Sequence, residues 1–219
     1  MITLYGFGRV HPEMLGQGRD LRAQWALEET GLPYRFHALD FIAGELDSPA
    51  YRRISPFRQV PVIDDDGIIV AESGAVVLYI AEKAGKLIPA DFIGRIQVVQ
   101  WCFAALTTVE RPLSGIDGID AGMGGVGAAE RRTVLVEEAN RWFAELERRL
   151  DGREWIACET FTVADILLVT ALREVGHTDL LKPYPRLNAY YARALARPAW
   201  ERTRRLCAER SGVPLADIP

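Results

Sequence analysis

The pattern of the sequence changes near residue 85, and this change limits the folds that the chain can adopt. Before that point, short apolar runs alternate with segments rich in helix formers, and after it strand signals almost vanish. The two patterns predict a small α/β domain followed by an all-helical domain. A chain of 219 residues is long enough for both.

The first 84 residues predict one four-stranded sheet. The run Asp64-Asp65-Asp66-Gly67 indicates a hairpin, because Asp-Gly tolerates the positive backbone angles of a tight turn. We expect one βαβ unit and then one ββα unit, with Asp20 capping the first helix. The predicted strands are residues 2–7, 34–39, 62–63 and 68–71, and the predicted helical segments are 21–30, 45–54 and 73–84.

The domain bounds follow from this pattern. We predict a first domain at 1–84, a linker at 85–91 and an all-helical domain at 92–219. Six glycines in 114–127 favour a mobile connector between the first two long helices of the second domain. The predicted helices of that domain include 93–109, an apolar stripe at 135–150, and 162–175, 186–196 and 199–209.

Charge patterning argues against a nucleic-acid partner. The 30 acidic and 26 basic residues give a net charge of -4, and their signs alternate along the chain. The nearest approach to a basic patch is the carboxyl-terminal end, where Glu201 and Glu209 interrupt the arginines, so we expect a solvated helix face there. The arginines concerned are Arg202, Arg204, Arg205 and Arg210.

A cytoplasmic location is predicted from several absences. The amino terminus lacks the basic start and apolar run of a secretory signal, and no run of about 18 apolar residues is found to span a bilayer. The cysteines Cys102, Cys158 and Cys207 are odd in number and lie far apart. This spacing argues against a disulfide framework and against a metal site.

The first local feature with a chemical interpretation is Gln59-Val60-Pro61, just before the hairpin. An X-Pro bond is cis at modest cost, and a cis bond here would turn the main chain of Val60 away from the sheet. An extended peptide could then pair with it as an added strand. The alternative is that Pro61 only opens a strand.

The second feature is Glu72-Ser73-Gly74, which follows the return strand and opens a helix. The Ser73 hydroxyl and the free N–H groups of the first turn form an anion site at the positive end of the helix dipole. Gly74 permits close approach of a carboxylate, and Glu72 can receive an ammonium group. Together they suit the head of an α-amino acid, although an ordinary capped helix has the same sequence.

The third feature, Phe161-Thr162-Val163-Ala164-Asp165, has a structural interpretation. Thr162 and Asp165 have the spacing of a capping box in its acidic form. We expect this box to begin a buried helix and to take no part in chemistry.

These features, in this order and over essentially the whole chain, resemble the glutathione S-transferase superfamily, in its bacterial cytosolic type. The matching text is Trp25-Ala26-Leu27-Glu28-Glu29-Thr30-Gly31-Leu32-Pro33-Tyr34, then Gln59-Val60-Pro61, Glu72-Ser73 and Phe161–Asp165. The resemblance implies a thioredoxin-like first domain, a helical second domain and a homodimer. It also implies that Val60, before a cis Pro61, pairs with the cysteinyl main chain of glutathione. Glu72 and Ser73 would hold the γ-glutamyl end, with Gln59 within reach.

The match fails at the group that activates the thiol. A free thiol has a pKa of about 8.5, so the enzyme must favour its anion. Family members use a Tyr, Ser or Cys, but the Cys-type position falls on Arg19, the Ser-type on Asp20 and the Tyr-type on Gly6 rather than Tyr5. Arg19 is the predicted catalytic residue, acting by charge with the helix dipole. His11, in the extended loop before this helix, is a further candidate.

The function predicted from this resemblance is a glutathione transferase, with glutathione as co-substrate and a small apolar electrophile as the second substrate, in detoxification. No metal is expected. Leu106, Val109 and Met123 are candidates for the wall of the electrophile pocket. The alternatives are a glutathione-dependent isomerase or dehalogenase, and a binding or assembly module that kept the fold and lost catalysis.

Overall fold

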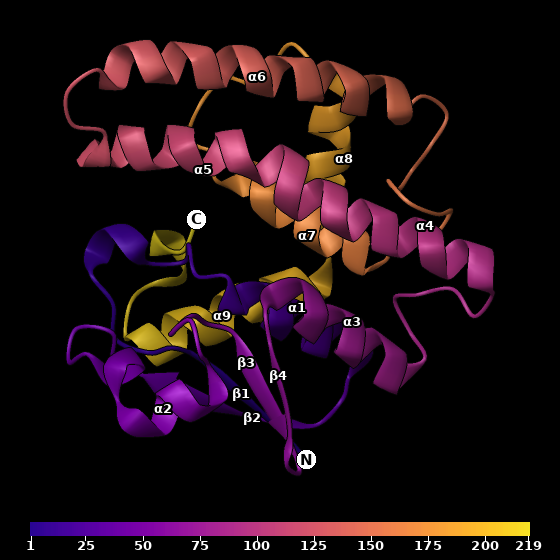
Figure 1. Cartoon of the computed structure of the whole chain (residues 1–219). Helices are drawn as coiled ribbons and strands as arrows, with labels where there is room; N and C mark the ends of the chain where they lie inside the picture. Colours follow the sequence, from indigo (N-terminus) through magenta and orange to yellow (C-terminus); the bar gives the residue numbers. More distant parts are fainter. The chain divides into compact units, whose positions relative to one another are not determined.

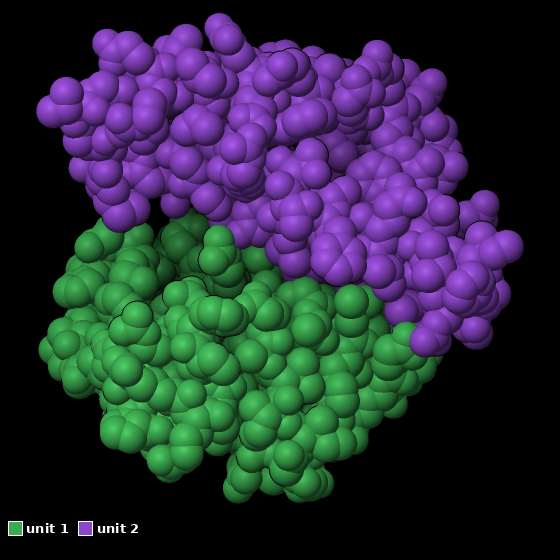
Figure 2. All heavy atoms as spheres, in the orientation of Figure 1, with its two compact units in different colours: residues 1–87, 197–219 green, residues 88–196 purple.

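The computed structural model describes all 219 residues and divides into two compact units (Figure 2). Unit 1 is Met1–Leu87 with Arg197–Pro219, and unit 2 is Ile88–Ala196. The predicted bounds differ from these units at the carboxyl terminus, because residues 197–219 were assigned to the helical domain and instead pack with the α/β unit.

Unit 1 contains the predicted four-stranded sheet, in the order β2-β1-β3-β4 (Figure 1). β1 is parallel to β2 and antiparallel to β3, and β3 forms an antiparallel hairpin with β4. The elements of unit 1 are β1 Ile2–Phe7, η1 Pro12–Met14, α1 Asp20–Thr30, β2 Tyr34–Leu39, η2 Glu45–Asp47, α2 Pro49–Ile54, β3 Val62–Asp65, β4 Ile68–Ala71, α3 Ser73–Ala84, α9 Pro198–Ser211 and η5 Leu215–Asp217.

The two faces of the sheet carry different residues of β1. Ile2 and Leu4 are fully buried, and Gly6 lies on their side, where a Cβ would come within 2.5 Å of an Asp20 oxygen at the start of α1. Tyr5 and Phe7 point to the opposite face and pack in a cluster with residues of α2. Only glycine therefore permits α1 to begin so close to the end of β1.

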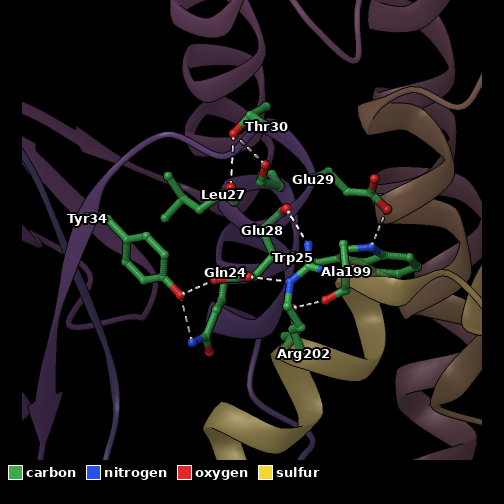
Figure 3. Close-up of polar contacts among 11 residues, drawn as sticks. Gln24, Trp25, Leu27, Glu28, Glu29, Thr30, Tyr34, Ala199 and Arg202 are labelled. Atoms are coloured by element: carbon green, nitrogen blue, oxygen red, sulfur yellow. Dashed lines mark hydrogen bonds and ion pairs between the residues drawn. The ribbon is translucent and has the colours of Figure 1, made fainter.

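α9 packs against α1 through one pair of tilted rings and several ion pairs. The rings of Trp25 and Trp200 lie 4.8 Å apart, and the indole N–H of Trp25 donates to Glu29. Arg197 binds both carboxylate oxygens of Glu29, at 2.6 and 2.9 Å. Figure 3 shows the neighbouring contact, in which Arg202 donates to the carboxylate and the carbonyl of Glu28.

These contacts correct the prediction of a solvated arginine face. Arg202 is only half exposed, and Arg204 donates to the carbonyl of Ile218. Arg210 is largely buried among residues of the sheet unit. Only Arg205 keeps to the predicted role, since it pairs with Glu201 on its own helix. Glu201 and Glu209 interrupt a basic patch, as predicted, but most of the arginines serve packing within unit 1.

Unit 2 is entirely helical. Its elements are α4 Phe92–Phe103, the π-helix η3 Ala104–Val109, α5 Glu110–Gly118, the π-helix η4 Ile119–Met123, α6 Ala128–Arg149, α7 Val163–Arg173 and α8 Pro185–Leu195. Every residue of α7 is buried, and the predicted capping box at Thr162 and Asp165 begins it. That prediction is confirmed.

The expected mobile connector is wrong over most of its length, because helix continues through Gly118 and Met123. Gly115 explains the error. A Cβ there would come within 2.7 Å of the Leu135 side chain, so the glycine allows α5 and α6 to pack closely.

The stretch Phe92–Met123 is a helical run of 32 residues, interrupted near its end by a kink at Gly122 (φ 85°), with a mean hydropathy of 1.3 in its most apolar part. By length and composition it could cross a membrane, although the core helix of a soluble protein passes the same test. The sequence had suggested that no such stretch exists. Its exposed apolar residues include Phe92, Ile96 and Phe103, which are spaced by four and seven and lie on one face of α4.

Candidate functional site

Ser73 is the first residue of α3, and its hydroxyl is held by a buried arginine. Nη1 of Arg22, on α1, donates to Oγ of Ser73 at 3.1 Å, and both side chains are buried. Because the oxygen accepts this bond, the hydroxyl proton stays available for a ligand. Glu72 occupies the cap position of α3, without a side-chain cap bond, and Ser73 is the first residue inside the helix.

The chain turns from β4 into α3 through an unusual conformation at Glu72. Its φ of 72° and ψ of 122° lie in a region that non-glycine residues rarely adopt. Such residues cost on the order of 1–3 kcal/mol and gather at ligand clamps and active sites. The Glu72 side chain is exposed beside the buried Ser73, so a carboxylate and a hydroxyl lie in sequence at the positive end of α3.

The main chain at Gln59 is fixed from α2 and the turn after it. Its carbonyl accepts from the Tyr51 hydroxyl at 2.8 Å and from Oγ of Ser55 at 2.9 Å, and its N–H donates to the same Oγ. Burial raises the pKa of Tyr51 to about 12, so this phenol stays a hydrogen-bond donor. The Gln59 side chain is exposed.

Val60 and Pro61 follow this anchored residue. The Val60–Pro61 peptide bond is cis. The Val60 side chain is buried in the cluster beneath α2, and the ladder of β3 begins only at Val62. The main-chain groups of Val60 therefore lie outside the sheet ladder.

Arg19 and Asp20 have different surroundings although they are adjacent. Arg19 is the amino-terminal cap residue of α1 and is exposed. Asp20 is 1% exposed, and its Oδ2 accepts from the N–H of Phe7 at 3.1 Å. Burial raises the pKa of the Asp20 carboxyl, and Arg210 acts in the opposite direction. The prediction that Asp20 caps α1 is wrong, because its carboxylate joins α1 to the end of β1 instead.

Tyr5 and His11, the other residues considered near the start of α1, have different surroundings. Tyr5 packs against His37 and Tyr51 on the face of the sheet away from α1, with ring centroids 4.8 and 6.2 Å apart. His11 is exposed, with its ring 6.0 Å from that of Phe41.

Cys102, Cys158 and the predicted wall residues belong to unit 2, whereas Cys207 lies on α9 of unit 1 and lines a small cavity with Asp20. Burial raises the pKa of the Cys102 thiol to about 12, which leaves it protonated. Leu106 and Val109 lie in η3, where Val109 is buried in the core of unit 2, and Met123 in η4 is exposed. Val109 is therefore a core residue of unit 2, and its side chain is not exposed to line a pocket.

Three residues of the site, Arg22, Tyr51 and Ser55, were missed by sequence reasoning. Arg22 and Tyr51 fix the Ser73 hydroxyl and the Gln59 carbonyl, respectively. Arg22 falls three residues before Trp25, on the buried side of α1. An arginine on a buried helix face needs a hydrogen-bond acceptor, and this was the available signal.

Comparison with known proteins fits this geometry. Residues 13–82 match the model for the glutathione S-transferase N-terminal domain, and residues 126–201 match one for the C-terminal domain. The disulfide-bond oxidoreductase YfcG of Escherichia coli is 30% identical over 183 residues, which cover 79% of this chain and 84% of YfcG. Glutathione S-transferase 1 of Triticum aestivum is 28% identical over 196 residues, covering 80% and 84%.

Solved structures are also similar. A glutathione transferase family member from Pseudomonas fluorescens with two glutathione bound has a TM-score of 0.80 and 27% identity, covering 92% of this chain and 91% of that chain. A transferase from Burkholderia graminis, also with two glutathione molecules per subunit, has a TM-score of 0.78 and 28% identity, covering 92% and 86%. The chain belongs to the glutathione S-transferase superfamily, and the predicted fold class is confirmed.

Proposed function

We propose that this protein binds glutathione on unit 1 and transfers its sulfur to a small apolar electrophile. The relatives confirm the enzyme class and the co-substrate, because they are named glutathione S-transferases and the structural neighbours hold glutathione. The electrophile and the residues are the proposed part. The observation that carries it is the Ser73 hydroxyl, held at the start of α3 by the buried Arg22.

The γ-glutamyl end would bind at α3. Its α-carboxylate would accept from the Ser73 hydroxyl and from the main-chain N–H groups of the first turn, where the helix dipole favours an anion. Its ammonium group would face the exposed Glu72 carboxylate. The cysteinyl part would pair with the main chain of Val60, before Pro61, and the exposed Gln59 amide lies one residue away.

Arg19 is the proposed catalytic residue. Each unit by which the thiol pKa falls requires about 1.4 kcal/mol of preferential stabilisation of the thiolate. The exposed guanidinium at the amino terminus of α1 and the helix dipole supply charge of the right sign. In the reaction, the thiolate sulfur forms a bond to the electrophilic carbon, the leaving group departs with its electron pair, and the thiol proton passes to water.

Calorimetry with glutathione tests the binding site. We expect heat of binding for the wild type. Ser73→Ala should bind glutathione at least about tenfold more weakly, because a hydrogen bond to a charged group is lost. Arg22→Met should show a similar loss of affinity. Ser114→Ala, in unit 2, is the matched control and should bind normally. Equal binding by Ser73→Ala and the wild type would overturn the assignment of Ser73.

Turnover is measured separately, with an aryl halide as the electrophile. Arg19→Ala should lower kcat with little change in glutathione affinity. Unchanged turnover in this variant would remove Arg19 from the mechanism. Binding without any turnover by the wild type would favour the non-catalytic module over the transferase.

A second candidate reaction is reduction of a disulfide by two glutathione molecules. The observation that favours it is the relationship to YfcG, named a disulfide-bond oxidoreductase. The placement of the cysteines, none before Cys102, argues against an exchange in which a cysteine of the protein takes part, so glutathione would supply both thiols. One glutathione thiolate would attack the disulfide and release a thiolate. A second glutathione would then attack the mixed disulfide, giving glutathione disulfide and a second thiolate. Turnover of hydroxyethyl disulfide, compared with the aryl halide, decides between the two reactions.

A homodimer in the cytoplasm, with a role in detoxification, is part of the same proposal. The apolar stripe on α4 supports the homodimer, because Phe92, Ile96 and Phe103 are 75%, 47% and 61% exposed. Light scattering of the wild type should give twice the chain mass. Phe103→Glu should give a single chain, and a monomeric wild type would exclude the dimer. Fractionation of the source cells tests the location.

A further inference from the structure

Arg210 is the last arginine of α9, and its side chain is 12% exposed. Its Nε donates to the carbonyl of Phe7, the last residue of β1, at 2.9 Å. Its Nη2 lies 3.7 Å from Oδ2 of Asp20, the first residue of α1. Its guanidinium also stacks on Phe36 of β2, 3.7 Å from the ring centroid. One side chain thus contacts three elements from the far end of the sequence.

Asp20 and Arg210 both bind the main chain of Phe7, where the end of β1 meets the start of α1. Its Oδ2 accepts from the N–H of Phe7, while Arg210 donates to the carbonyl of Phe7. Both main-chain groups of Phe7 are therefore bound, one by each member of a charge pair. The other carboxylate oxygen, Oδ1, is buried without a partner in the chain, and Asp20 lines a cavity of about 10 Å³, roughly the space of one water molecule.

The extended loop at 8–19 is held by the same helix and the residues after it. Gly16 packs so closely against the tail that a Cβ would lie 2.7 Å from Pro219 and 3.1 Å from Ile218. Arg204 of α9 donates to the carbonyl of Ile218 and so fixes that tail. The loop that leads into the amino terminus of α1 therefore rests on the carboxyl-terminal segment.

We infer that Arg210 is a positioning residue for the reaction: through Phe7 and Asp20 it sets the place and the net charge of the amino terminus of α1, where the glutathione thiolate forms. This inference rests on the proposed function, since it requires the thiolate to lie at that terminus. Arg210 is too buried to touch a substrate, so any effect that it has on the reaction must be transmitted through Phe7 and Asp20.

The net charge at the amino terminus of α1 depends on the groups that surround Asp20. Arg210 and Cys207 face it from α9, Tyr51 is close enough on α2 to sense its charge, and Arg19 and Arg22 lie in its own first turn. Arg210 forms an ion pair with the Asp20 carboxylate, with Nη2 3.7 Å from Oδ2. Burial already favours the neutral form of Asp20, so the effect of removing Arg210 scales with the fraction of Asp20 that stays ionised; that uncompensated charge would oppose the helix dipole and raise the pKa of the bound thiol.

The experiment compares the pH dependence of aryl-halide conjugation among variants. Arg210→Met should lower kcat by about tenfold, as a misplaced reacting group does. It should also move the acidic limb of the kcat profile up by about 0.5 unit, the shift that one charge at a helix terminus gives. The KM for glutathione should change by less than about threefold, because the γ-glutamyl contacts at α3 are untouched. The double variant Arg210→Met with Asp20→Asn removes both charges and should restore the limb.

Two controls separate positioning from a loss of stability. Arg202→Met removes a comparable contact of α9 with α1, but at Glu28, near the opposite end of α1. It should lower the unfolding temperature without moving the acidic limb. Arg210→Lys is the second variant, for use if Arg210→Met does not fold. It keeps the positive charge in a smaller side chain, so the acidic limb of its kcat profile should stay at the wild-type pH.

Each outcome bears on the inference. An unmoved limb in a folded Arg210→Met, or the same shift in Arg202→Met, would overturn the positioning role and leave the transferase intact. A wild-type chain that does not conjugate glutathione would overturn the proposed function first.

Discussion

Asp165 offers the sharpest test of how unit 2 is held together. Its Oδ1 accepts from the N–H of Ile156 at 2.9 Å and from the Tyr190 hydroxyl at 3.0 Å. Its Oδ2 accepts from the N–H of Thr162 at 2.8 Å and from the Thr162 hydroxyl at 3.2 Å. The carboxylate is fully buried, so Asp165→Ala leaves these donors without a partner or access to water.

The magnitude follows from the donors that cannot turn away. The N–H groups of Ile156 and Thr162 are fixed by the main chain, and Tyr190 is fully buried. Each unpaired buried donor costs about 1–3 kcal/mol, so the three donors left by Asp165→Ala should cost about 3–9 kcal/mol. A domain is stable by only about 5–15 kcal/mol, so this is a large share. Asp165→Asn keeps one oxygen acceptor and should lose about half as much.

Urea unfolding followed by tryptophan fluorescence measures this loss. Trp155 is a local reporter, because its ring lies 4.9 Å from that of Phe161 and 6.0 Å from that of Tyr190. Asp151→Ala, at an exposed carboxylate in the same unit, is the control and should leave the midpoint unchanged. If Asp165→Ala costs less than about 1 kcal/mol, the four hydrogen bonds do not stabilise unit 2 as the geometry requires.

Three further outcomes are expected. Gly6→Ala should destabilise unit 1 strongly, because its Cβ would lie 2.5 Å from a carboxylate oxygen of α1, and thermal unfolding measures the loss. Tyr51→Phe should raise the KM for glutathione by about tenfold or less, because the carbonyl of Gln59 loses a donor that helps to fix the main chain before Val60; an unchanged KM would separate Tyr51 from the site. The ion pair with Arg132 lowers the pKa of Asp120 to about 2, so its stabilisation is full above the ordinary value near 4 and disappears as the pH falls through 2. The unfolding midpoints of the wild type and Asp120→Asn should therefore differ modestly at pH 6 and converge near pH 2, with a constant difference arguing against the pair.

Local signals predicted much of the fold. The Asp66-Gly67 turn sets the hairpin between β3 and β4, and Gly31 and Gly85 end α1 and α3 with positive φ. The Thr162 capping box spans four residues. Each of these features is fixed by neighbours in sequence, so a single sequence contains the information.

Contacts between distant segments explain what the sequence did not predict. Arg22 and Ser73 are separated by 51 residues, and Arg210 and Phe7 by 203. Arg22, Ser73 and Arg210 are each a polar residue on a helix, and only the packing shows which groups they bind. Gly115 was interpreted wrongly for a different reason. From sequence alone, a glycine that permits close helix packing cannot be distinguished from one that makes a loop flexible.

The placement of α9 has a consequence for how the chain is made. Unit 2 interrupts unit 1, so the ribosome completes all of residues 88–196 before the last part of unit 1 emerges. Until then, the side of Trp25 that contacts Trp200 is uncovered, and Glu29 lacks its ion pair with Arg197. The first segment to be synthesised is therefore among the last to reach its final packing. Nascent chains that stall before residue 197 should expose the apolar surface of Trp25, which chaperones can bind.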